Sequence, residues 1–278
     1  MFEPMFMRLA LVAAVASGAS LGLMGVYLVM RRVVFLGLVL ANAATVGSAL
    51  AQAFGWVPEV ASIAAAVVAA LVLGALPVPR RVSAESIMGW AYAATSSATV
   101  LILARAAKAD ADTLHLLFGN LLAVSFGHAA ALVAVAAGMG LVHLLFHRRF
   151  LLVTFDPETA TVAGVKTSLW SMCLNLSIGV AAAAAVHEIG ALLTFALLTL
   201  PAMGALLVTS SVRAAFMTAA AGGAILGVLG LAVSFYFDLP AGPASVALLA
   251  ISILLTAVIR ITPFHNRPVF GSKEAKAI

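Results

Sequence analysis

The sequence predicts an all-α membrane protein, a polytopic bundle of about nine transmembrane helices, with eight as the other possible count. Hydrophobic residues make up 64% of the 278 positions and charged residues only 9%, whereas soluble proteins carry about 25% charged residues. The charged residues also lie mainly at the ends of apolar stretches close to the roughly 20 residues that cross a bilayer. Residues 1–278 are therefore expected to form one transmembrane domain.

Four apolar segments in the first part of the chain are long enough to cross a membrane, namely 9–30, 33–54, 60–76 and 87–104. The first is too long for a signal-peptide core and has no small-residue cleavage site, so we expect a retained helix. It ends at Arg31 and Arg32, and a predicted turn over 55–59 separates the second segment from the third.

Five further segments follow in the second part of the chain, namely 129–146, 168–186, 189–208, 214–237 and 244–259. The basic run His147, Arg148 and Arg149 is predicted to end the fifth helix. Before it, the short segment 114–125 contains Gly119 and Asn120, and it could be a half-helix or the start of the next span.

The positions of the basic residues predict the orientation. With nine spans and an outside N-terminus, every lysine and arginine except Arg8, Arg105 and Lys108 falls on the cytoplasmic side, as the positive-inside rule requires. The C-terminus is then cytoplasmic. The outer side receives the acidic residues Glu3, Glu59, Asp110, Asp112, Glu188 and Asp238. An acidic outer mouth would attract cations, although acidic residues contribute little to topology and can lie there by default.

A polar segment over 155–166 interrupts the apolar sequence and falls on the predicted cytoplasmic side. Asp156 suits an N-cap, Pro157 the first helical position, and Glu158 the positive end of the helix dipole, with Gly164 as a stop. Such a helix could contact a soluble partner or could be a capped connecting loop. The chain has no Gly-x-x-x-x-Gly-Lys-Ser/Thr sequence, so we expect any ATP hydrolysis to occur on a separate subunit.

A polar stripe marks the second predicted helix, at Asn42, Thr45, Ser48 and Gln52. Spacings of three, three and four residues put these side chains on one helix face. They could line a hydrated translocation path or form hydrogen bonds between helices. Pro201, within the segment 189–208, removes one backbone hydrogen bond and could bend a helix that lines the same path.

His187 and Glu188 are the only adjacent histidine and carboxylate in the chain, and they are the candidate metal ligands. Their predicted place is the outer end of the seventh span, where they could also form an ordinary polar helix end. Neighbouring helical residues point about 100° apart, so joint coordination of one ion is unfavourable. His115, His128 and His143 stand alone in the sequence and are predicted to be packing or interfacial residues. The single cysteine, Cys173, excludes a cysteine metal cluster.

Four sequence blocks, in order, resemble the permease subunits of bacterial zinc, manganese and iron ABC importers. The blocks are Arg31-Arg32 with 35–37, Leu117–Ser125, Phe155-Asp156-Pro157-Glu158-Thr159-Ala160 with Gly164, and Gly190–Ala202. The resemblance covers almost the whole chain. It implies a type II importer fold, a homodimer in the bacterial inner membrane, an ABC ATPase subunit that uses ATP, and an extracytoplasmic solute-binding protein. It also implies that 155–166 is the cytoplasmic coupling helix, and that this chain itself is no enzyme and binds no cofactor.

The chain departs from this family at one informative place. The permeases that it resembles commonly carry an aspartate and a histidine, four residues apart, directly after the glycine of the second span. Here Leu38 and Asn42 occupy those positions, and an amide oxygen is a poor ligand for zinc. The cargo could therefore be a divalent metal ion, or a metal chelate or small polar solute. A secondary transporter driven by an ion gradient is a further alternative, although the spans hold few carboxylates for ion coupling.

Overall fold

The computed structural model describes residues 5–76, 81–105 and 124–261, and the predicted all-α class is confirmed across these ranges. The helices are α1 (Met5–Met30), α2 (Val34–Phe54), α3 (Pro58–Ala75), α4 (Ala84–Arg105), α6 (Phe126–Phe155), α7 (Pro157–Val162), α8 (Thr167–Val208), α9 (Val212–Phe237) and α10 (Ala241–Ile261). All except α7 are long and apolar enough to cross a membrane, which gives eight such helices among the described residues.

Helix α8 contains 42 residues and is interrupted at Gly190, where φ is 79° and ψ is 161°. Uninterrupted, it would be about 63 Å long at 1.5 Å per residue, twice the 30 Å hydrocarbon core of a bilayer. The combination of φ and ψ at Gly190 is open essentially to glycine alone. Gly190 therefore divides α8 into a first arm, residues 167–189, and a second arm, residues 191–208.

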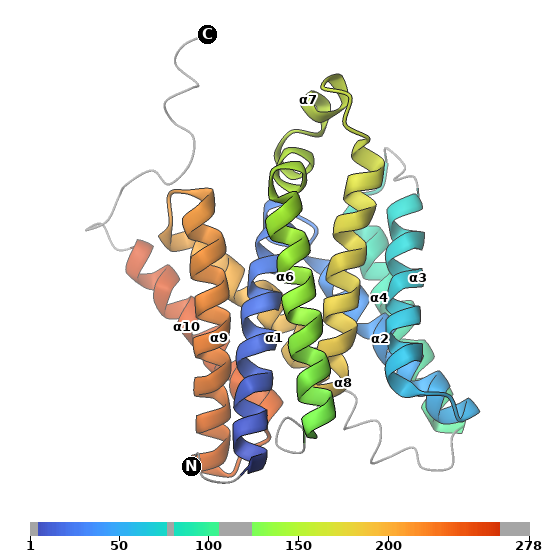
Figure 1. Cartoon of the computed structure of the whole chain (residues 1–278), viewed down its shortest axis with the longest axis vertical. Coiled ribbons are helices and arrows are strands. Elements are labelled where there is room, and N and C mark those ends of the chain that lie inside the picture. The colour runs from blue at the N-terminus through green and yellow to red at the C-terminus, as the bar shows by residue number, and fades with distance from the viewer. Residues whose placement is uncertain (1–4, 77–80, 106–123, 262–278) are drawn as a thin grey trace.

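The two arms of α8 run in opposite directions (Figure 1). At the end of the first arm, His187 lies beside Glu59 in the first turn of α3. The second arm brings Leu198 against Gly25 and Gly37, which lie near the other end of the bundle. The chain therefore turns back at Gly190, and α8 crosses twice. With the seven other long helices this makes nine crossings in the described ranges, as predicted.

The ends of the bundle differ in charge. We call the end that carries Arg31, Arg32, Arg81, Lys166 and Arg213 the basic face, and the opposite end, with Glu59, Glu188 and Asp238, the acidic face. The acidic face also carries Arg8 and Arg105. This distribution follows the sequence prediction, which places the basic face in the cytoplasm.

Two predicted helix boundaries are wrong. Helix α6 does not end at His147–Arg149 but continues to Phe155, because no glycine or proline stops it before Asp156-Pro157. Arg149 is accommodated over the ring of Trp170, 4.7 Å from its centroid. Helix α3 begins at Pro58, so Glu59 is helical and not part of a turn. Of the predicted segment 114–125, residues 114–123 lie outside the described residues, and Ser125 is the N-cap of α6.

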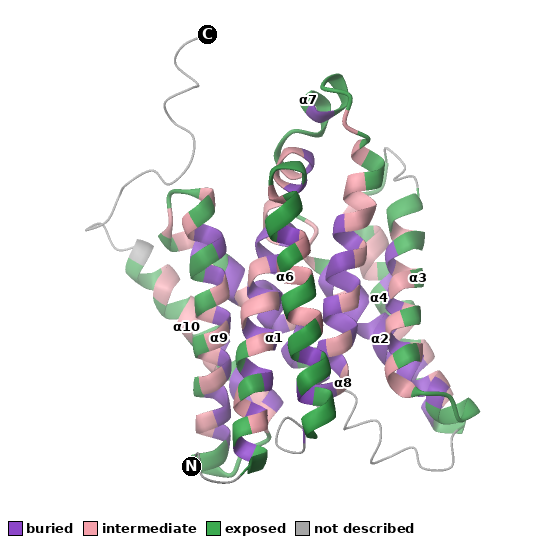
Figure 2. Cartoon of the chain, viewed as in Figure 1, coloured by how far each residue is buried: buried purple, intermediate pink, exposed green. Residues whose placement is uncertain are grey.

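The core lies where α1, α2, α8 and α9 pack together, and these helices carry most of the buried residues in Figure 2. Glycines allow the backbones of α1 and α9 to touch. A Cβ added at Gly223 would lie 2.1 Å from the carbonyl oxygen of Gly18, and one added at Gly22 would lie 2.4 Å from that of Ala219. Close approach of this kind is a main source of helix association in membranes.

The adjacent glycines 222 and 223 provide a matched test of this contact. We expect Gly223→Ala to lower the thermal unfolding temperature of the detergent-solubilised protein by several degrees, because its Cβ meets the backbone of α1. Gly222→Ala meets nothing within 4 Å and should be neutral or stabilising, since alanine favours helix by about 1 kcal/mol over glycine. Intrinsic tryptophan fluorescence during heating measures both. Equal unfolding temperatures for the two variants would contradict the packing of α1 on α9.

Candidate functional site

Helix α7 begins with a complete N-cap. The Asp156 carboxylate accepts hydrogen bonds from the Thr159 amide at 2.9 Å and from the Thr159 hydroxyl at 2.5 Å. These two bonds from Thr159 hold the pKa of the Asp156 carboxyl below its usual range, so this residue is charged at neutral pH. Pro157 occupies the first helical position. The predicted cap and start of this helix are confirmed.

Helix α7 ends in a Schellman motif, the hydrogen-bonded stop that requires a left-handed residue. Gly164 supplies that residue with φ of 77°. The Val165 amide donates to the carbonyl oxygen of Ala160 at 2.9 Å, and the Gly164 amide donates to that of Thr161 at 3.0 Å. The predicted stop at Gly164 is confirmed.

Helix α7 projects beyond the ends of α6 and α8 at the basic face (Figure 1). Only Ala160 of its residues is buried. Phe155 is 51% exposed and Val162 90% exposed, while Glu158 adds an exposed negative charge in the first turn. An apolar side chain at each end of a short, polar, water-exposed helix is an arrangement that a soluble protein can bind.

The polar stripe of α2 lies largely inside the bundle. Thr45 bonds Thr99 of α4 at 3.2 Å, and Ser48 bonds Ser62 of α3 at 2.7 Å. Asn42 is buried and donates to the carbonyl of Leu38 at 3.1 Å. Gln52, near the acidic face, is exposed. Thr45 and Ser48 thus join α2 to α4 and α3. Asn42 is the member of the stripe that lies nearest the basic face.

Pro201 lies buried in the second arm of α8. The backbone stays helical on both sides of it, and the only non-helical residue inside α8 is Gly190. Since proline has no amide hydrogen, the carbonyl of Leu197 loses its usual helical partner. Because the backbone is non-helical only at Gly190, the sharp change of direction occurs there, eleven residues before Pro201, and Pro201 does not cause it.

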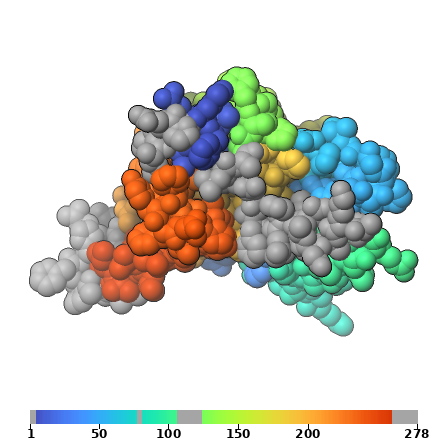
Figure 3. Space-filling view, turned by 90° about the horizontal axis from the view of Figure 1, so that it is seen from below, coloured from blue at the N-terminus to red at the C-terminus, as the bar shows by residue number. Residues whose placement is uncertain are grey.

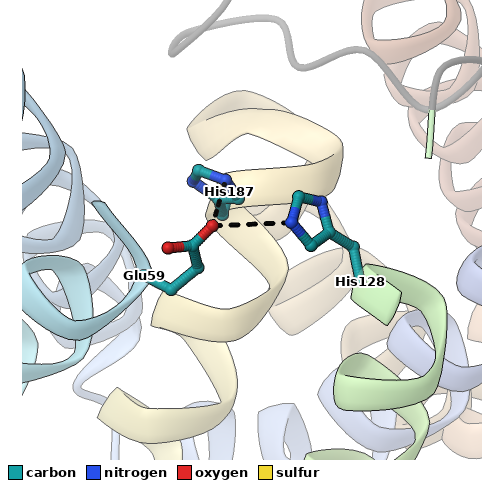
Figure 4. Close-up of side chains that lie close together, drawn as sticks. All are labelled: Glu59, His128 and His187. Carbon is teal, nitrogen blue, oxygen red and sulfur yellow. Dashed lines mark ion pairs between the residues drawn. The ribbon is translucent and has the colours of Figure 1, made fainter. Parts of the chain in front are cut away.

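Three side chains from three helices meet at the acidic face (Figure 4), and we call Glu59, His128 and His187 the histidine cluster. Glu59 comes from the first turn of α3, His128 from the first turn of α6, and His187 from the last turn before Gly190. One oxygen of Glu59 lies 3.3 Å from Nε2 of His187 and 3.5 Å from Nε2 of His128. Seen from this face in Figure 3, the yellow surface of α8 lies between the green α6 and the blue end of α2 and α3.

Glu188 joins the histidine cluster from behind. Its side chain is 10% exposed, and one carboxylate oxygen lies 3.2 Å from Nδ1 of His128. His187 and Glu188 thus contact different partners, in keeping with the angle between adjacent helical residues. Their predicted place in the seventh span is wrong, because both lie in the first arm of α8, before the chain reverses.

Sequence reasoning missed Glu59 and His128 as members of this site. His128 was predicted to be a packing or interfacial residue, and it is an exposed residue at the acidic end of α6 that also contacts Glu59 and Glu188. The signal that could have linked these residues was the predicted topology, which places both Glu59 and Glu188 on the outer side of the membrane. The packing prediction is confirmed for His143, which is 2% exposed. Its ring lies against Tyr27 and Phe150, with centroids 5.2 and 5.0 Å away. His115 lies outside the described residues.

Comparison with known proteins decides the family. The model of a family described as the ABC 3 transport family matches residues 3–261. The chain belongs to the ABC 3 transport family. It is therefore a multi-pass membrane permease subunit of an ABC transporter, as the four sequence blocks predicted.

Relatives and solved structures agree with membership of the ABC 3 family. The manganese transport system membrane protein MntC of Halalkalibacterium halodurans is 27% identical over 252 residues, covering 91% of this chain and 86% of the relative. The chelated iron transport system membrane protein YfeD of Yersinia pestis is 26% identical over 270 residues, covering 97% and 89%. A chain of PsaBC from Streptococcus pneumoniae has the same fold, with a TM-score of 0.82, 24% identity and 91% of each chain covered.

Proposed function

We propose that this ABC 3 family permease imports a divalent metal ion across the bacterial inner membrane by alternating access. Its relatives include proteins named for manganese transport and for chelated iron transport. The observation that carries the proposal is α7, a helix capped at both ends and exposed on the basic face. The positive-inside rule makes that face cytoplasmic, where a soluble ATPase can reach it.

The energy source in this proposal is a partner subunit. The chain has no phosphate-binding Gly-x-x-x-x-Gly-Lys-Ser/Thr loop, so an ABC ATPase docks on residues 155–166 of each protomer of a homodimer. ATP binding closes the two ATPases and moves α7, and through α6 and α8 the movement reaches the acidic face. An extracytoplasmic solute-binding protein delivers the cargo there. The translocation path includes the polar stripe of α2 and the second arm of α8 around Pro201.

The cargo has one alternative that a specific observation favours. Leu38 and Asn42 stand where similar permeases carry a carboxylate and an imidazole, and Asn42 already donates to a backbone carbonyl within α2. A site without those two ligands suits a metal chelate, whose metal is held by its own ligands. The name of the Yersinia pestis relative refers to chelated iron.

Transport in proteoliposomes tests the proposal. The permease is reconstituted with its ATPase and binding protein, and uptake of Mn²⁺, Zn²⁺ and Fe²⁺ is measured with ATP and with a non-hydrolysable analogue. We expect uptake only with ATP. Accumulation of chelated iron but not of the free ions would assign the chelate as cargo. Uptake that follows a proton or sodium gradient without ATP would contradict the ATP-driven mechanism.

A further inference from the structure

The histidine cluster at the acidic face has the composition of a transition-metal site. We propose that Glu59, His128 and His187 bind a divalent transition-metal ion at the outer mouth, before it enters the bundle. The identity of this ion as cargo rests on the proposed function, but the binding itself does not. Two imidazoles and a carboxylate favour Mn²⁺, Fe²⁺, Co²⁺ or Zn²⁺ over Mg²⁺ and Ca²⁺, which prefer oxygen ligands alone.

The distances within the cluster match those of a coordination shell. A zinc-like ion lies about 2.0–2.2 Å from imidazole nitrogens and carboxylate oxygens, so ligand atoms at two corners of a tetrahedron are about 3.4 Å apart. The Glu59 oxygen lies 3.3 and 3.5 Å from the two Nε2 atoms. The three candidate ligand atoms all lie within 4.8 Å of one another. Small side-chain rotations would therefore bring them onto one ion.

Glu188 completes the arrangement as a residue that orients a ligand. Metal-bound histidines almost always donate their second ring N–H to a carboxylate or carbonyl, which fixes the tautomer and the ring orientation. The Glu188 carboxylate lies 3.2 Å from Nδ1 of His128, which leaves Nε2 of His128 directed at Glu59. A buried carboxylate placed behind a histidine in this way supports a metal site more strongly than the three ligands alone.

A small cavity borders the cluster. Its volume is about 80 Å³, and apolar side chains such as Ile63, Leu132 and Val135 complete its wall. A single water needs only about 10–15 Å³ measured this way, so an ion and several of its waters fit. Three protein ligands leave the remaining coordination positions to water, which permits exchange of the ion.

The cluster also lies where a bound ion would link helices that move in the proposed transport cycle. It joins α3, α6 and the first arm of α8, and His187 lies three residues before the reversal at Gly190. It lies at the opposite end of α2 from Leu38 and Asn42. The cluster is therefore a separate site from the position of Leu38 and Asn42.

Cobalt binding to the purified, detergent-solubilised permease tests the site without the ATPase. Co²⁺ gives visible d–d absorption when nitrogen ligands replace water, and Zn²⁺ competition then gives affinities. We expect one ion per protomer, with affinity reduced at least tenfold by Glu59→Gln or His187→Ala. Glu188→Gln should weaken binding by about 10–100-fold, as loss of an orienting carboxylate does. Asp238→Asn is the matched control, because it removes a charge from the same face outside the cluster.

Two results would overturn the proposal. One is the absence, in the wild-type protein, of a Co²⁺ d–d absorption that Zn²⁺ displaces, which would make the cluster an ion-pair contact between helices. The other is equal affinity in the wild type, Glu59→Gln and His187→Ala. If binding follows the proposal but reconstituted wild-type protein shows no ATP-dependent metal uptake, the site stands and the proposed function fails. Thermal unfolding of each variant separates loss of a ligand from loss of the fold.

Discussion

The double variant Phe155→Ala, Val162→Glu is expected to release the ATPase from the permease and to abolish ATP-driven uptake. Both side chains are exposed to water at the basic face, 90% and 51% respectively, so they contribute little to the fold of the chain alone. Truncating a hot-spot residue at the centre of an interface costs about 2 kcal/mol or more, about 30-fold in affinity, and burying the charge that Val162→Glu introduces against an apolar partner surface adds to this cost. Co-purification and the dissociation constant for the ATPase measure the effect.

Leu144→Ala is the control for this double variant. Leu144 is 75% exposed, but it lies within the apolar part of α6, more than ten residues before α7 begins. We expect unchanged ATPase binding for this variant. If the ATPase binds the double variant as tightly as the wild type, residues 155–166 are not its docking element.

Gly190→Ala is expected to destabilise the protein through backbone strain, without any need for a steric clash. At φ 79° and ψ 161°, a residue with a Cβ costs of the order of 1–3 kcal/mol, and the strain falls where the two arms of α8 reverse. About 2–4 °C of unfolding temperature is lost per kcal/mol for a protein of 150–250 residues. The histidine cluster should be displaced as well, because His187 lies within one turn of Gly190.

The control for Gly190→Ala is Gly138→Ala in α6, where an added Cβ meets nothing within 4 Å. This variant should retain the wild-type unfolding temperature. We expect Gly190→Ala to lower both the unfolding temperature and the rate of uptake. Unchanged values for Gly190→Ala would mean that the chain does not turn at this residue.

Much of the fold could be predicted because hydropathy and charge act locally along the chain. The apolar segments gave the nine crossings and the basic residues gave the two faces. The end of α6 was predicted wrongly, since His147 and Arg149 looked like a helix end. A charged side chain can remain in a continuing helix when a tertiary partner such as Trp170 covers it, and that partner lies on another helix.

The two candidate sites differ in how far their contacts reach along the sequence: those of α7 are local, and those of the histidine cluster are not. Every bond that starts and stops α7 joins residues within five positions of one another, such as Asp156 with Thr159 and Ala160 with Val165, so the sequence predicted the helix. The histidine cluster depends on the packing of α3 and α6 against the first arm of α8. Sequence spacing carries no information about that packing, and only His187 and Glu188 could be selected in advance.

The two caps of α7 bear on how the proposed ATPase partner would bind. A helix of six residues is far below the length of about 12–15 at which isolated helices become marginally stable in water, yet α7 is already formed in the free chain. Little conformational entropy is therefore lost when the partner binds, and preorganisation of this kind strengthens affinity. Calorimetry of the association should accordingly show a heat-capacity change that matches the apolar surface covered at Phe155 and Val162, without the larger change that accompanies coupled folding.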